Sequence, residues 1–120
     1  MFDHIGLRVR DLAASRRFYT AALAPLGHVP GSAGDDYAGF GPEGSPALWL
    51  HASAKGSAAH LCFAAPSRDA VARFHAAALA AGGRDNGAPG LRADYAPTYY
   101  AAFVIDPDGN NVEAVCMAPG

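Results

Sequence analysis

The fold is decided near the end of the chain, by the stretch Asp106-Pro107-Asp108-Gly109-Asn110-Asn111-Val112-Glu113. An apolar run ends at its first residue, a Pro-Asp-Gly turn reverses the chain, and a second run begins. Glu113 lies inside this second run. A charge on a half-buried strand is costly unless it is paired, hydrogen-bonded or bound to a cation. Glu113 is therefore a candidate functional residue, and the rest of the chain should supply its partners.

The two halves of the chain repeat each other at a constant offset of 56 residues. The matched pairs are His4 with His60, Asp11 with Ser67, Arg17 with Arg73, Phe18 with Phe74, Ala22 with Ala78, Leu23 with Leu79 and Gly27 with Gly83. Both helix caps, both aromatic anchors and a histidine near the start of each half coincide, which indicates a duplicated unit. The sequence therefore predicts one domain over 1–120, made of module 1–55 and module 56–120.

Each module is predicted to hold a strand, a helix and a short meander. Alternating apolar residues predict first strands over 2–10 and 59–65, and helices follow from Leu12 to about Ala24 and from Ser67 to Gly82. Further strands are expected near 27–30, 37–40, 47–52, 99–105 and 110–117, the last two after a loop over 84–98. A loop of that length indicates a lid or a binding segment. The predicted fold class is α+β, with two paired β-α-β-β-β modules forming a mixed sheet.

Composition and charge narrow the classes of partner. The net charge is -2 and the chain has no basic stripe, which argues against nucleic acid and anionic membranes. Two cysteines are too few for a disulfide framework, no charged and apolar leader follows Met1, and no apolar run reaches the roughly 18 residues of a membrane span. These features predict a cytoplasmic protein whose partner is a small molecule or another protein chain.

Two histidines are the candidate partners of Glu113. His4 and His60 lie on the first strands of the two modules, and two imidazoles with one carboxylate suit manganese, iron, cobalt, nickel or zinc. Other interpretations remain open at this point. A strand histidine is usually structural, and Glu113 could pair with Arg8 or Arg10 instead.

The repeat also shows which ligand the first module lacks. Residues 41–44 echo the turn at 106–109, so the counterpart of Glu113 is either Leu48 or Trp49. Alternation assigns Leu48 to the core face of its strand, which leaves Trp49 at the ligand position. A symmetric site would hold four ligands, and this chain offers three.

The chain resembles the vicinal oxygen chelate superfamily, also called glyoxalase/bleomycin-resistance/dioxygenase, in its paired modules, its strand histidines, the Phe-Tyr pair of the first helix and the stretch 106–113. The resemblance covers nearly the whole chain, and the terminal Asp-Pro-Asp-Gly-Asn-x-x-Glu stretch is its most specific part. It implies an open cup of sheets with helices on the outer face, and a divalent ion at the floor that chelates vicinal substrate oxygens. It also implies metal ligands at His4, His60 and Glu113, a catalytic role for Glu113, and a homodimer.

Within that family the chain departs from several kinds of enzyme. Resemblance to glyoxalase I implies a fourth ligand, a glutamate, where this chain has Trp49, and methylmalonyl-CoA epimerases carry a glutamine there. Fosfomycin-resistance transferases and extradiol dioxygenases match the set of two histidines and one glutamate. The transferases, however, have a threonine where this chain has Gly6, and the dioxygenases have a tyrosine where it has Phe103. The resemblance therefore does not select a reaction.

Two functions from different classes follow. The first is a metal-dependent lyase, isomerase or transferase acting on a small oxygenated compound, which the complete set of two histidines and one glutamate favours. The second is a metal-free binding protein of the bleomycin-resistance kind that sequesters a drug-like ligand, which Trp49 favours. The candidate substrate contacts are Trp49, His51, Arg8, Tyr95, Tyr99 and Tyr100, and Cys62 is either a soft ligand or a small buried thiol.

Overall fold

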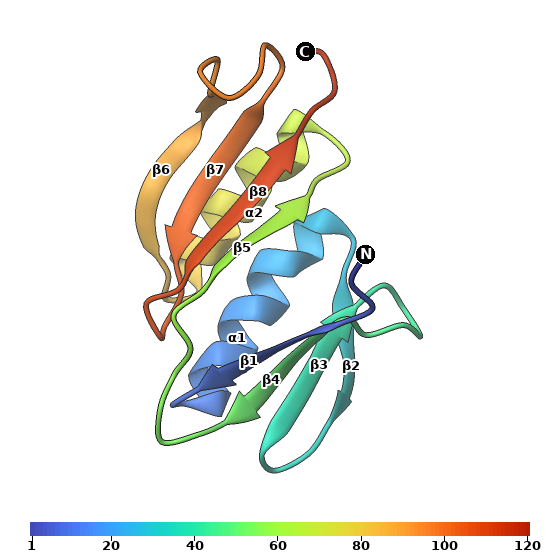
Figure 1. The fold of residues 1–120 in the computed structure, drawn as a ribbon, viewed down its shortest axis with the longest axis vertical. Helices are drawn as coiled ribbons and strands as arrows, with labels where there is room; N and C mark the ends of the chain where they lie inside the picture. Colours follow the sequence, from blue (N-terminus) through green and yellow to red (C-terminus); the bar gives the residue numbers. More distant parts are fainter.

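The fold consists of two four-stranded sheets and two α-helices, and the computed structural model describes all residues from 1 to 120 (Figure 1). The first module contains β1 (Ile5–Val9), α1 (Leu12–Leu23), a short 3-10 helix (Ala24–Leu26), β2 (Val29–Ala33), β3 (Tyr37–Gly41) and β4 (Leu48–Ala52). The second module contains β5 (His60–Ala64), α2 (Arg68–Ala80), β6 (Arg84–Leu91), β7 (Tyr100–Ile105) and β8 (Asn111–Cys116). These elements confirm both predicted β-α-β-β-β modules.

Both sheets have the same strand order, β1-β4-β3-β2 in the first module and β5-β8-β7-β6 in the second. The first strand of each module runs parallel to the last, and the other neighbouring strands are antiparallel. The sheets are therefore mixed, as the α+β prediction requires, but they remain two separate sheets. Their edge strands β1 and β5 face each other across the middle of the molecule (Figure 1).

The predicted loop over 84–98 is wrong in its first half, because Arg84–Leu91 forms β6. This strand lies at the edge of its sheet, and its pairing with β7 shifts register on both sides of Gly87. Edge strands tolerate glycine and proline, so a sequence with the composition of a loop, Arg-Asp-Asn-Gly-Ala-Pro-Gly-Leu, can still pair. Only residues 92–99 connect β6 to β7 without a strand or helix.

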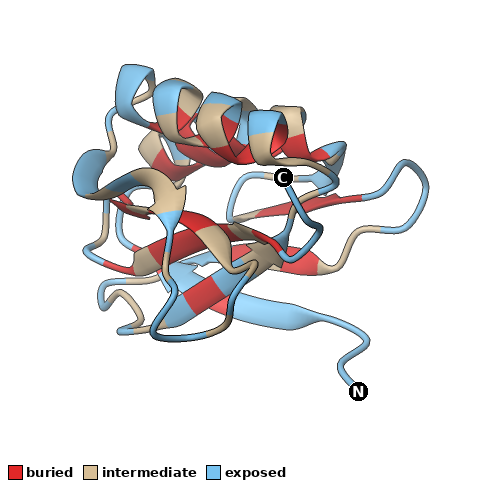
Figure 2. Ribbon diagram, turned by 90° about the horizontal axis from the view of Figure 1, so that it is seen from above, coloured by how far each residue is buried: buried red, intermediate tan, exposed pale blue.

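Both helices begin at the predicted caps. The Asp11 carboxylate accepts a hydrogen bond from the Ala14 N–H, and the Ser67 hydroxyl oxygen accepts one from the Ala70 N–H, each at 3.0 Å. The helices lie on the same side of the sheets (Figure 2), as expected for the outer face. Their buried residues are Ser15, Phe18, Tyr19, Ala22, Leu23, Ala70, Val71, Phe74 and Ala78. The opposite face of the sheets, called the cup face below, is free of helices.

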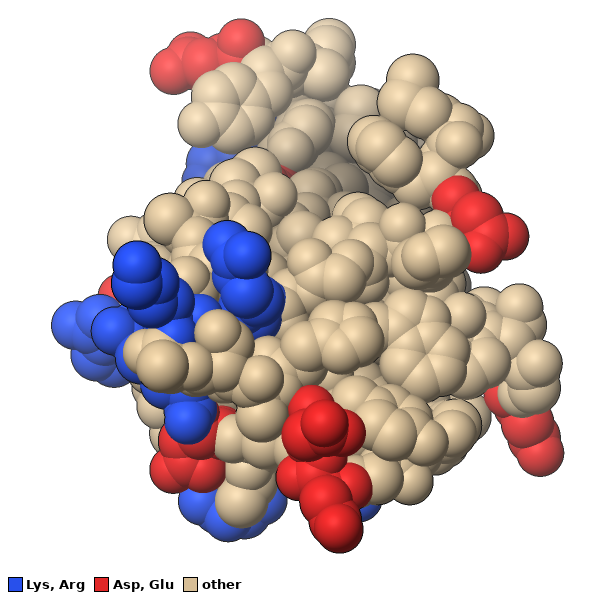
Figure 3. Space-filling view, turned by 60° about the horizontal axis from the view of Figure 1, so that its bottom comes forward, with Lys and Arg blue, Asp and Glu red and all other residues tan.

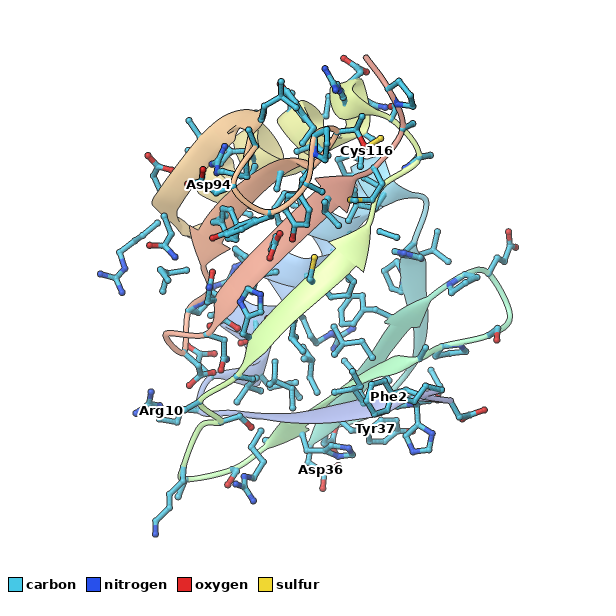
Figure 4. All side chains as sticks on the ribbon, turned by 45° about the horizontal axis from the view of Figure 1, so that its top comes forward. Phe2, Arg10, Asp36, Tyr37, Asp94 and Cys116 are labelled. Atoms are coloured by element: carbon cyan, nitrogen blue, oxygen red, sulfur yellow. The ribbon has the colours of Figure 1, made fainter.

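The turn between β7 and β8 joins the two modules. The Tyr19 hydroxyl of α1 donates to the buried Asp106 carboxylate at 2.5 Å, and the Asn110 side chain donates to the same carboxylate at 2.9 Å. Arg10, which follows β1 (Figure 4), donates through Nε to Asp108 at 2.9 Å. A core of 21 buried residues also draws on both modules. The stretch that decides the fold therefore acts as the link between its halves.

Charged side chains are unevenly spread over the surface. In the view of Figure 3, lysine and arginine gather at one side, acidic side chains lie at several places on the face, and the centre carries neither charge. Neither helix has the length and hydrophobicity that crossing a bilayer requires. Cys62 and Cys116 are free thiols, so the packed core and its hydrogen bonds hold the fold without a disulfide.

Candidate functional site

Glu113 lies at the centre of the cup face of the second module. Its neighbours Val112 and Ala114 along β8 belong to the buried core, so the alternation of the strand turns Glu113 to the opposite face. Cys62 of β5 and Phe103 of β7 are its partners on the adjacent strands. Glu113 is only 3 % exposed, although no helix covers this face. A buried carboxylate is therefore built into the floor of the second sheet.

The Glu113 carboxylate has partners on both oxygens. His60 Nε2 lies 3.0 Å from Oε1, and the Tyr99 hydroxyl donates to Oε2. The open alternative of an ion pair with arginine is wrong, because Arg10 binds Asp108 and Arg8 takes part in none of the ion pairs. The only basic side chain that contacts Glu113 is the imidazole of His60.

Two further protonated groups, Cys62 and Tyr99, accompany His60 near this carboxylate. Desolvation of the Cys62 sulfur, followed by the charge of Glu113 and a hydrogen bond to it, raises the pKa of the thiol to about 12. Donation to Glu113, followed by desolvation, raises the pKa of Tyr99 well above its ordinary value. Both groups therefore stay protonated at neutral pH, and the Tyr99 hydroxyl donates to Glu113. Cys62 is exposed as a residue, rather than buried as the sequence-based alternative had it, and its thiol is not ionised.

His4 stands apart from this group. It precedes β1, its side chain is 60 % exposed, and its Nδ1 lies 2.7 Å from Oδ1 of the neighbouring Asp3. His4 and His60 both line a cavity of about 390 Å³ between the modules, together with apolar side chains of the two sheets. No three His, Cys, Asp or Glu side chains of this chain lie close enough together to hold one metal ion. The structure thus brings His60 and Glu113 into contact and leaves His4 on another part of the cavity that His60 lines.

The cup face of the first module is aromatic instead of acidic. The Trp49 indole lies over Gly39, where an added Cβ would come within 2.6 Å of the ring, and the Tyr37 ring centroid is 6.3 Å away. His51 follows on the same face of β4, near Gly6, where an added Cβ would be in ordinary contact with the imidazole at 3.7 Å. Gly39 is therefore the glycine that makes space for a flat side chain on this half of the cup.

The strand registers confirm that Trp49 stands where a symmetric site would have a second carboxylate. Trp49 pairs with Gly6 of β1, as Glu113 pairs with Cys62 of β5, and Gly6 is the repeat counterpart of Cys62. On the other side Trp49 pairs with Gly39 of β3, as Glu113 pairs with residue 103 of β7. The assignment made from alternation alone is therefore correct.

The other predicted contacts are distributed over both faces. Tyr95 is 66 % exposed in the loop over 92–99 and packs edge to face on Tyr99 at 5.1 Å. Arg8 is exposed on β1, opposite His51 of β4. Tyr100 lies on the helix side of its sheet, packed against the core with the guanidinium of Arg68 over its ring at 5.0 Å. The structure therefore separates Tyr100 from the surface around Glu113.

One further residue of this surface is Arg92, which the sequence placed in the predicted binding loop but not among the candidate substrate contacts. Its guanidinium lies over the Phe103 ring at 5.4 Å on the cup face, next to Glu113. Arg92 begins the loop that also carries Asp94, at the edge of the second sheet (Figure 4). The only signal in the sequence is the pair of glycines just before the arginine, Gly87 and Gly90, and glycines are equally typical of a loop.

Comparison with known proteins agrees with this architecture. Residues 1–114 match the family model described as Glyoxalase/Bleomycin resistance protein/Dioxygenase superfamily. No curated protein matches the chain. Among solved structures, a glyoxalase/bleomycin resistance protein from Albidiferax ferrireducens T118 is 32 % identical, with a TM-score of 0.84 over 99 % of both chains.

More distant structures share the fold. A glyoxalase-related enzyme from Fulvimarina pelagi is 23 % identical, with a TM-score of 0.71 over 93 % of this chain and 84 % of its own. A family member from Burkholderia phytofirmans PsJN is 19 % identical, with a TM-score of 0.73 over 97 % and 98 %. The family model over residues 1–114 and the structure that is 32 % identical show that the chain belongs to the glyoxalase/bleomycin resistance protein/dioxygenase superfamily.

Proposed function

We propose that this protein is a metal-dependent enzyme of its superfamily, a lyase, isomerase or transferase. In this proposal His4, His60 and Glu113 hold a divalent ion, and a small substrate with vicinal oxygens binds over it. One observation carries the proposal: a carboxylate that is 3 % exposed lies on the helix-free face with an imidazole nitrogen 3.0 Å from it and no arginine or lysine. A stable fold has no need of such a pair.

The donor set fits a divalent ion in its chemistry. Imidazole nitrogen and carboxylate oxygen are the ligands of manganese, iron, cobalt, nickel and zinc in sites that keep positions open for substrate. In position the fit is partial, because a single chain brings only His60 and Glu113 into contact. The metal site therefore needs a third ligand from the protein, which the proposal assigns to His4.

We propose that this third ligand is His4 of a second copy of the chain. The His4 side chain is 60 % exposed and precedes an edge strand, so it can reach beyond its own module. In a two-fold symmetric dimer, His4 of each copy would face His60 and Glu113 of the other, and the two sites would be identical. The apolar residues exposed at the same end, Met1, Phe2 and Ile5, would be covered by such a contact.

The residues around Glu113 have defined roles in this proposal. The bound ion would supply Lewis acidity toward the substrate oxygens. Glu113, which accepts hydrogen bonds at both oxygens, is the one cup-face carboxylate able to take a proton from a bound substrate. Tyr99 stays protonated, so its hydroxyl donates a hydrogen bond that orients the Glu113 carboxylate. Phe103, the cross-strand neighbour of Glu113, forms an apolar wall that limits water around these groups.

Metal analysis of substituted proteins tests the proposal. The protein is purified without chelators, loaded in turn with manganese, iron, cobalt, nickel and zinc, and analysed for bound metal. We expect near-stoichiometric metal in the unmodified protein and at least tenfold less in His60→Ala and in Glu113→Gln. His51→Ala removes a cup-face imidazole of the other sheet and should keep its metal. The absence of stoichiometric metal after all five loadings would refute the metal-dependent function.

A metal-free binding protein is the second candidate function. It is supported by the Trp49 indole, which lies flat over Gly39 and beside Tyr37 on the cup face of the first module. Aromatic faces of this kind stack on planar ligands and attract cations. If no metal binds, this candidate predicts quenching of the single tryptophan's fluorescence by planar cationic compounds, and loss of that binding in Trp49→Ala.

A further inference from the structure

Arg92 is held on the cup face of the second module by a built environment. Its guanidinium lies over the Phe103 ring at 5.4 Å, and its Nη2 donates to the Ala88 carbonyl oxygen at 2.8 Å. Gly87 and Gly90 of β6 flank it, and a Cβ at either would lie 3.2 Å from a guanidinium nitrogen. Larger residues at those two positions would press on the guanidinium, so its place in the fold is specific.

No carboxylate neutralises this guanidinium. None of the ion pairs of the structure includes Arg92, and Asp94, two residues further on, is not paired with it. Of the five N–H groups of the guanidinium, the structure commits one, to the Ala88 carbonyl. Arg92 is half-buried, so a charge held there without a partner carries a desolvation cost that a bound anion would offset.

The position of Arg92 relative to Glu113 is set by Phe103. Phe103 is the cross-strand neighbour of Glu113, it carries the guanidinium over its ring, and the His60 ring stacks on it at 6.5 Å. Both oxygens of Glu113 already have hydrogen-bond partners in His60 and Tyr99, and the carboxylate forms no ion pair with the guanidinium. The cup face of the second module thus holds the pair of His60 and Glu113 next to Phe103, and the same ring carries the guanidinium of Arg92, which has no counter-ion.

We propose that Arg92 binds an oxyanion group of the ligand, a carboxylate, phosphonate or phosphate, and so makes the protein selective for anionic compounds. A planar fork of N–H donors matches the paired oxygens of such groups, which a lysine cannot reproduce. The inference rests on the proposed function only in placing the ligand over Glu113. The recognition itself needs the guanidinium and no metal.

A matched pair of ligands tests this selectivity. Catechol and 3,4-dihydroxybenzoate both offer vicinal oxygens, and they differ only in one carboxylate. Their dissociation constants are measured by calorimetry on the full chain, once loaded with cobalt and once free of metal. We expect the benzoate to bind about tenfold more tightly than catechol in the unmodified protein. Arg92→Gln should bring the two affinities together, and Arg92→Lys should give an intermediate preference.

Two controls separate recognition from structure. Arg84→Gln removes an exposed arginine from the start of the same strand, β6, and should keep the full preference. Thermal melting of Arg92→Gln shows whether the loss of the Ala88 bond unfolds the loop, and Arg92→Lys retains the charge if it does. The inference would be overturned if Arg92→Gln still preferred the benzoate over catechol. It would also be overturned if the unmodified protein showed no such preference, either loaded with cobalt or free of metal. Failure to take up cobalt would instead count against the metal-dependent function, and the metal-free titrations would still decide the role of Arg92.

Discussion

Trp49 and Glu113 occupy equivalent positions in the two modules, and the exchange of a carboxylate for an indole is matched by a second exchange on the neighbouring strand. Glu113 pairs with Phe103 of β7, whereas Trp49 pairs with Gly39 of β3. The first module therefore has its large ring on β4, opposite a glycine of β3, whereas the second module has its ring on β7, opposite the carboxylate of β8. Each pair thus holds one aromatic ring, and only the pair of the second module holds an acid.

This exchange predicts a strong coupling between Gly39 and Trp49. A Cβ at residue 39 would come within 2.6 Å of the indole, so Gly39→Ala should destabilise the protein by about 1–3 kcal/mol in urea unfolding. In the background of Trp49→Ala the same substitution should cost much less, because the ring that it strikes is gone. Equal costs in the two backgrounds would show that the indole does not rest on β3.

The hydrogen bond between Tyr19 and Asp106 predicts a loss of stability on removing one hydroxyl. Asp106 is buried and its carboxylate also accepts from Asn110, so Tyr19→Phe should leave part of a buried network unpaired and cost about 1–3 kcal/mol. Tyr37→Phe is the matched control, since that exposed hydroxyl has only a 3.4 Å contact with Ser32. A cost at Tyr19 no larger than at Tyr37 would contradict a linking role for the bond.

The same tyrosine predicts how stability changes at alkaline pH. Burial, and then the Asp106 charge, raise the pKa of Tyr19 well above its ordinary value. In the unfolded chain the phenol ionises near pH 10, while in the folded protein it stays neutral. The stability that Tyr19 contributes is therefore complete below about pH 10 and is lost as pH rises through the folded pKa. The free energy of unfolding, measured with urea between pH 9 and 11, should fall less steeply with pH in Tyr19→Phe than in the unmodified protein. Above pH 10 the two slopes should differ by up to about 1.4 kcal/mol per pH unit.

The sequence predicted most of the fold, because the repeat and the alternation of apolar residues report burial directly. The helix caps Asp11 and Ser67 and the position of Trp49 all follow from such local patterns. β6 was missed because an edge strand needs few apolar residues and tolerates the glycines that also mark loops. Arg92 was placed in the same loop without a role at the site, since its position over a ring of β7 depends on a pairing between strands that periodicity does not reveal.

The candidate site was predictable only to the level of residue type. Sequence patterns put His60 and Glu113 on one face, and the structure brings them to 3.0 Å. The same patterns treated His4 as equivalent to His60, whereas in the structure it is exposed and bonded to Asp3. Periodicity assigns a face within one module, but it carries no information on how two modules, or two chains, place their faces against each other.

The proposed sharing of His4 between two copies predicts the outcome of mixing inactive variants. Alone, His4→Ala and Glu113→Gln should each lose the metal, because every site in either dimer lacks one ligand. When equal amounts are unfolded together and refolded, half of the dimers should be mixed, and each mixed dimer should regain one intact site. Elemental analysis should then find about one ion for every four chains. If each chain built its site alone, mixing would restore no metal, and a sedimentation mass of one chain for the unmodified protein would rule out sharing from the start.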